Sequence, residues 1–88
     1  MNGNRIRFQP TPNPNSMKFT LEKPVIQKGM ANFNSREEAD GTPVAKRLFE
    51  IDGVTGVLMM ENFVSVNKSA SGNWGVIVPL VVEILQSL

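Results

Sequence analysis

Acidic side chains are the first residues whose types and spacing could do chemistry. The 88 residues include neither cysteine nor histidine, so a metal ion would find only oxygen ligands, which suit hard cations. The carboxylates nearest one another, Glu37, Glu38 and Asp40, lack the alternating Asp/Asn spacing of a calcium loop. The pattern therefore favours a solvated turn, and we expect no metal site and no cofactor. Binding of iron or another hard cation through these carboxylates or Glu61 stays open as an alternative.

Nucleophilic and acid–base catalysis find equally little support. The serines have no histidine base to activate them, and the chain has no thiolate. Glu50 and Asp52 flank the end of an expected helix, where a solvated role is favoured. Gly53 and Gly56 are isolated and lack a lysine at the spacing of a phosphate-binding loop. We therefore expect a protein that acts by binding and is not an enzyme.

The Pro-Asn loop, residues 10–15, is the first candidate binding site. Its prolines fix their own φ and bias the preceding residues toward extended conformations, whereas asparagine side chains can bond to the local backbone. Such a stiff loop would present polar atoms at a low entropic cost of binding. A purely structural turn is the compatible alternative. The candidate partner-binding residues of the loop and the strand after it are Asn13, Pro14, Asn15, Met17 and Lys18, with Lys18 on the outward face.

A second candidate lies where two later strands meet. Met59 and Met60 point to opposite faces of a strand, so one of them is expected outside the core, where methionine makes adaptable apolar contacts. Met60 and Phe63 are accordingly the candidate partner-binding residues here. Simple core or edge packing is the alternative interpretation.

The periodicity of the chain supplies the elements that position these residues. Alternation predicts strands over 5–9, 16–21, 54–60 and 63–67, and residues 30–33 could form a short edge strand. Thr42-Pro43 marks the start of one helix, and Asn73 caps the last helix, which Pro79 should kink. We expect one domain over residues 1–88 with an α+β, two-layer fold. Its four-stranded, mainly antiparallel sheet carries two helices on one face, in the order ββαββα.

The last helix is apolar nearly all round, with Glu83 its only charge after Trp74. Val76, Leu80 and either Val82 or Ile84 must therefore be covered by loops or presented to a partner. A homodimer through this helix is one expectation that follows.

The net charge of +1 hides an uneven distribution, because most of the basic residues lie in the first 34 positions. This is not the dense basic stripe of a nucleic-acid binder, so we expect no nucleic-acid partner. A peptide- or anion-binding regulatory domain that uses the basic N-terminal strands stays open. No apolar tract is long enough for a membrane span, and residues 1–5 lack the pattern of a signal peptide, which predicts a cytoplasmic protein with no membrane partner.

Several segments of the chain form a combination that is unusual in its composition and order: Thr11-Pro12-Asn13-Pro14-Asn15-Ser16-Met17-Lys18-Phe19, residues 48–54, residues 62–68, Asn73-Trp74 and the mid-helix Pro79. Together they resemble the N-terminal domain of Nfu/NifU-type iron–sulfur scaffold proteins. The resemblance implies contacts with iron–sulfur assembly or client proteins. In full-length members of the family a Cys-x-x-Cys pair in a separate C-terminal domain holds the cluster, and no residue here matches it. The resemblance therefore implies a docking domain that does not ligate a cluster, with a Cys-x-x-Cys scaffold in trans as one partner.

Overall fold

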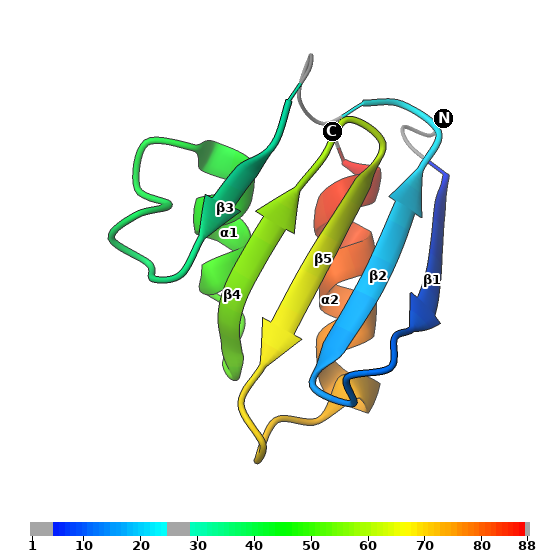
Figure 1. Ribbon diagram of the computed structural model, residues 1–88, viewed down its shortest axis with the longest axis vertical. Helices are drawn as coiled ribbons and strands as arrows, with labels where there is room; N and C mark the ends of the chain where they lie inside the picture. Colours follow the sequence, from blue (N-terminus) through cyan, green and yellow to red (C-terminus); the bar gives the residue numbers. More distant parts are fainter. Residues whose placement is uncertain (1–4, 25–28, 88) are drawn as a thin grey trace.

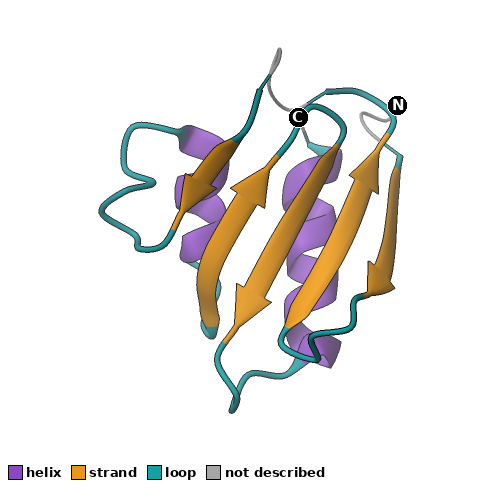
Figure 2. Ribbon diagram, viewed as in Figure 1, coloured by secondary structure: helices purple, strands orange, loops and turns teal. Residues whose placement is uncertain are grey.

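The computed structural model describes residues 5–24 and 29–87, which form one antiparallel sheet with two helices on one of its faces (Figure 1 and Figure 2). The predicted α+β, two-layer fold is thus confirmed. Along the chain the elements are β1 (Ile6–Pro10), β2 (Ser16–Leu21), β3 (Ala31–Phe33), α1 (Pro43–Phe49), β4 (Val54–Met59), β5 (Phe63–Lys68) and α2 (Trp74–Gln86).

The sheet has five strands in the order β1-β2-β5-β4-β3, whereas four were predicted. The added strand is β3, in the segment that the sequence allowed as a short edge strand. It pairs antiparallel with β4, with Ala31 opposite Met59 and Phe33 opposite Val57. Three residues are too few for a clear periodicity, and the buried side chain of Phe33 is what anchors the strand to the core.

The antiparallel pairing of β2 with β5 determines which loops lie at the same end of the sheet. Ser16 lies opposite Asn67 and Thr20 opposite Phe63, so the start of β2 adjoins the end of β5. The Pro-Asn loop therefore shares one end of the sheet with the connection from β5 to α2, and the β4–β5 turn lies at the other end (Figure 1).

The core fills the space between the sheet and the helices. Alternate residues of the three central strands point inward and are buried: Met17, Phe19 and Leu21 of β2, Val57 and Met59 of β4, and Val64 and Val66 of β5. The helices cover them with Ala45 and Leu48 of α1 and with Ile77, Val81 and Leu85 of α2. The inward side chains predicted for β2 are confirmed. Met59 is buried and Met60 is more exposed, so the expectation that one of the two methionines lies outside the core is confirmed.

Both helix starts lie where the sequence predicted them. The Asn73 side chain accepts a 2.8 Å bond from the Gly75 N–H and caps α2 as expected. Thr42 is the N-cap residue of α1, but its hydroxyl makes no capping bond, and only its carbonyl accepts from Lys46 N at 2.9 Å. After α1 the chain turns into β4 at Gly53, whose φ of 99° is a left-handed conformation that favours glycine.

The surplus apolar face of α2 is partly covered. Ile84 is buried, whereas Val76 is 58% exposed and Leu80 40% exposed. Pro79 lies inside the helix on the same outer side. A homodimer through this face stays a prediction.

Candidate partner-binding surface

The Pro-Asn loop is folded by its own polar groups. The Thr11 hydroxyl lies 2.9 Å from the Asn13 carbonyl and accepts from the Asn13 N–H at 3.1 Å. The Asn13 side-chain oxygen accepts from Asn15 N at 2.9 Å, and the Asn13 carbonyl accepts from Ser16 N at 3.0 Å. These are the local asparagine bonds that the sequence suggested, and they make the loop a defined turn.

Residues far along the chain fasten the same loop to β5 and α2. The Trp74 indole N–H donates to the Pro14 carbonyl at 2.9 Å. The Lys68 ammonium donates to the Asn15 side-chain oxygen at 3.0 Å and lies 5.7 Å from the Trp74 ring centroid, within the range of a cation–π interaction. Lys68 N also donates to the Asn15 carbonyl at 2.8 Å. We call these contacts of Lys68 and Trp74 the loop clasp.

The loop is a structural turn, as the alternative interpretation of its sequence held, because the side-chain oxygens of Asn13 and Asn15 both accept hydrogen bonds within the fold. A binding role is compatible with it, since Asn13 and Pro14 are exposed at the surface. Sequence reasoning missed Lys68 and Trp74 as the supports of the loop. The one signal available was that a tryptophan N–H close to a core needs an acceptor.

The second group of candidates lies on the sheet face that the helices leave uncovered, which we call the open face. Lys18 projects onto this face as predicted, and its ammonium lies 4.6 Å from the ring centroid of Phe63 on β5. Beside Phe63, the β4–β5 turn and the two residues before β3 border a shallow hollow of about 560 Å³, which we call the hairpin hollow. It is lined by Gly29, Met30, Met60, Glu61, Asn62 and Phe63.

The structure therefore separates the candidate residues into two groups. Asn13, Pro14 and Asn15 lie at one end of the sheet, and Met60 and Phe63 lie at the other. The Ser16–Asn67 pair beside the loop and the Thr20–Phe63 pair are four residue steps apart along β2, roughly 13 Å. Lys18 lies between the groups and reaches toward the second.

Met17, a predicted partner-binding residue, is buried in the core. Its side chain is only 8% exposed on the helix-covered face of β2, so it cannot meet a partner directly. Its contribution is to the core beneath Lys18, as its place in the alternating pattern of β2 requires.

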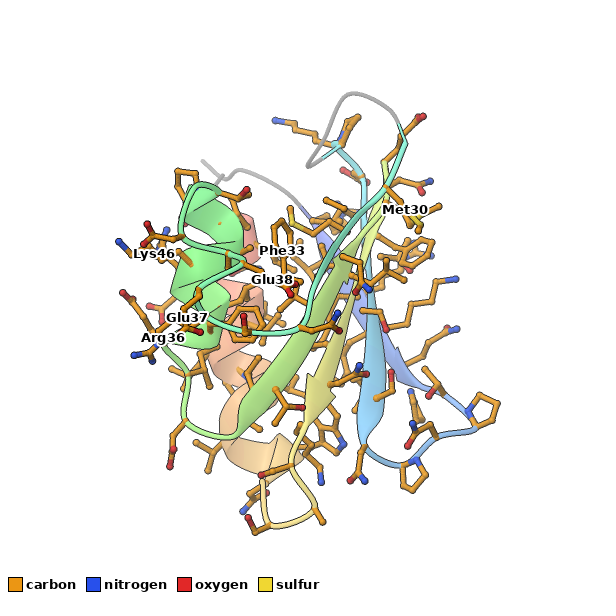
Figure 3. All side chains as sticks on the ribbon, turned by 60° about the vertical axis from the view of Figure 1, so that its left-hand side comes forward. Met30, Phe33, Arg36, Glu37, Glu38 and Lys46 are labelled. Atoms are coloured by element: carbon orange, nitrogen blue, oxygen red, sulfur yellow. The ribbon has the colours of Figure 1, made fainter. Side chains whose placement is uncertain are left out.

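The acidic candidates do not converge on a metal site. Figure 3 shows Arg36 and Glu37 on the outer side of their loop and Glu38 beside Phe33. Glu38 accepts from Asn34 N at 2.8 Å, and Asp40 is 3.6 Å from the Lys46 ammonium. Within residues 5–24 and 29–87, no three acidic side chains come together in a way that could hold a metal ion.

The same part of the chain contains no helix with the length and apolar character needed to cross a bilayer. Residues 1–4, which carry most of the expectation about a signal peptide, lie outside the described residues.

Comparison with known proteins gives one consistent family. A family model described as "Scaffold protein Nfu/NifU N terminal" matches residues 6–88. NifU-like protein 4, mitochondrial, of Arabidopsis thaliana is 42% identical over 74 residues, which are 84% of this chain and 26% of that protein. The NFU1 iron-sulfur cluster scaffold homolog, mitochondrial, of Drosophila grimshawi is 38% identical over 81 residues, which are 91% of this chain and 27% of that protein. The chain thus spans about a quarter of the length of these curated relatives.

Solved structures share the fold. The crystal structure of protein SAV1430 from Staphylococcus aureus superposes with a TM-score of 0.78 at 23% identity and covers 92% of this chain and 98% of that one. The solution structure of a NifU-like protein from Saccharomyces cerevisiae gives 0.76 at 21% identity and covers 93% of this chain and 75% of that one. At these identities the likeness concerns the arrangement of the sheet and the helices.

Proposed function

Because the chain belongs to the family of Nfu/NifU N-terminal domains, we propose that it is a non-catalytic protein-interaction module in iron–sulfur cluster assembly or delivery. It would contact assembly or client proteins and leave the cluster to another polypeptide or domain. A Cys-x-x-Cys scaffold acting in trans is one such partner.

The observation that carries the proposal is which metal-ligating side chains these 88 residues contain. Iron–sulfur clusters are held by cysteine thiolates, with histidine as the main substitute, and the sequence contains neither. The carboxylates that remain are spread over the described surface without forming a metal site. A member of a scaffold family with this composition is better suited to docking than to cluster ligation.

The clasped Pro-Asn loop supports a docking role. Its backbone is fixed by bonds to Trp74 and Lys68 before any partner arrives, so binding would cost little conformational entropy. Asn13 and Pro14 remain exposed for contact. A cytoplasmic location stays a prediction, and the two curated relatives described above are named as mitochondrial proteins.

The proposal predicts that the protein alone retains no cluster. After anaerobic incubation with ferrous iron and sulfide, followed by desalting, we expect no bound iron or sulfide and no visible absorption of a cluster. A Cys-x-x-Cys scaffold domain carried through the same procedure is the positive control. Retention of iron and sulfide in stoichiometric amounts would contradict the proposal. Iron retained without sulfide, with a calorimetric titration that saturates, would favour the alternative of a carboxylate cation site.

The proposal also predicts binding to purified iron–sulfur assembly or client proteins. With the chain labelled with ¹⁵N, we expect titration by a cluster-loaded Cys-x-x-Cys scaffold or a client apoprotein to shift the amide signals of Asn13 and Asn15. Signals of α1, which packs against β4 near the other edge of the sheet from the loop, are the internal control (Figure 1). Binding that leaves Asn13 and Asn15 unperturbed would remove the loop from the docking surface, and absence of binding to every such protein would remove the proposed function.

A further inference from the structure

The acidic residues of the chain lie outside the strands of the sheet. The sequence has eight Asp and Glu residues, and none of them lies in any of the five strands. They occupy the loops, the turns and the helical layer: Glu22, Glu37, Glu38, Asp40, Glu50, Asp52, Glu61 and Glu83. The strand residues that point to the open face therefore include no acidic group.

Two charged strand residues, Arg7 and Lys18, point to the open face, and both are positive. Arg7 lies opposite Thr20, and Lys18 lies opposite Gln9, so the two cations are diagonal neighbours on adjacent strands, with Cα atoms about 7–8 Å apart. Ion pairs join Arg5 to Glu22 and Lys46 to Asp40, and neither involves Arg7 or Lys18. These two cations are thus available to a partner.

An apolar hollow adjoins these cations. Phe63, whose ring lies under the Lys18 ammonium, also lines the hairpin hollow. Met30 on its other side is 66% exposed, and Met60 is half-buried, so the lining presents flexible thioether side chains. A side chain that entered the hollow would bury apolar surface next to a positive charge. Glu61 also lines the hollow and would repel a carboxylate placed there.

We propose that the open face docks an acidic protein segment, with an apolar side chain in the hairpin hollow and the carboxylates that follow it along Lys18 and Arg7. The partner's identity as an assembly or client protein rests on the proposed function, whereas its chemistry rests on this face. Because Glu61 would repel a carboxylate at the hollow, the segment should bind with its apolar end in the hollow and its acidic end toward Lys18 and Arg7. A nucleic acid is the poorer fit, because its affinity comes from many phosphate contacts and the face offers two cations.

The probe for this site is a synthetic peptide with blocked ends that carries one leucine followed by glutamates and aspartates. Its control replaces each acidic residue by its amide. Titrated into the ¹⁵N-labelled protein, the acidic peptide is expected to shift the amide signals of β2, β5 and the β4–β5 turn, with an affinity that falls as salt is added. We expect Lys18→Glu and Arg7→Glu each to weaken binding by about five- to ten-fold, because each turns an attraction into a repulsion. Arg47→Glu, the same change at an exposed position of α1, is the matched control and should leave binding unchanged.

Four results would overturn the inference. Three concern the peptide: no binding of the acidic peptide, equal binding of the amide peptide, or equal binding of the acidic peptide by Lys18→Glu and the unmodified protein. The fourth is tighter binding of a thymidine oligonucleotide than of the peptide, which would indicate a nucleic-acid surface. Repeating the variants with purified assembly or client proteins separates the two proposals. If those proteins bind and Lys18→Glu has no effect, only this inference fails. If none binds while the peptide does, the proposed function fails and the acidic-segment site remains.

Discussion

Replacing Phe19 with alanine is expected to lower the free energy of unfolding by about 3–5 kcal/mol, the largest effect of any change discussed for this fold. Phe19 is fully buried at 0% exposure in the middle of β2, between the neighbouring strands β1 and β5. Its removal would leave a cavity in the core between the sheet and the helical layer, and packed cores do not close such cavities completely. A domain of 88 residues has a total stability of about 4–13 kcal/mol, so the variant should be marginal. Urea denaturation followed by circular dichroism measures the loss.

The matched control is Phe8→Ala on the adjacent strand. The rings of Phe8 and Phe19 lie 6.2 Å apart, but Phe8 is on an edge strand and 54% exposed. Its truncation should cost about 1 kcal/mol, since it removes half-hydrated surface and opens no closed cavity. Equal losses for the two variants would contradict the account of β2 as the centre of the core.

The parts of the fold that the sequence predicted are those encoded within a few residues. The alternation of residues 16–21 predicted that Met17, Phe19 and Leu21 point inward, and all three are buried. The Asn73 cap depends on a bond to a residue two positions away. In each case the physical cause is local, namely the period of a strand or the unpaired N–H groups of a first helical turn.

The parts that the sequence could not predict depend on contacts between distant residues. The sequence allowed a short edge strand at residues 30–33, but the place of β3 beside β4 depends on Ala31 meeting Met59 across the sheet, a pairing that three residues of local pattern do not reveal. The loop clasp joins Trp74 to Pro14 across 60 positions and Lys68 to Asn15 across 53. Lys18 was correctly placed on the outward face, but its contact with Phe63 follows only from the pairing of β2 with β5. The strand order thus determines which outward side chains become neighbours.

Trp74→Ala has the second largest expected effect, a loss of about 3 kcal/mol of unfolding free energy together with release of the Pro-Asn loop. The change removes a partly buried indole, its bond to the Pro14 carbonyl and the ring beside the Lys68 ammonium. Without the Trp74 part of the clasp, the loop keeps its local bonds and the two bonds from Lys68 to Asn15. Faster amide hydrogen exchange at Asn13 and Asn15, with little change at Val64 in the core, would show the release.

Trp74→Phe separates the hydrogen bond from the packing. It keeps an aromatic ring near Lys68 and removes the N–H that donates to Pro14, so its stability loss should be about 1 kcal/mol. If the loop is a preorganised docking element, this variant should bind assembly or client proteins more weakly, although it alters no exposed loop residue, because binding must then order the loop. Unchanged affinity in a variant whose loop exchanges faster would mean that the loop serves the fold alone. Docking would then depend on the open face around Lys18.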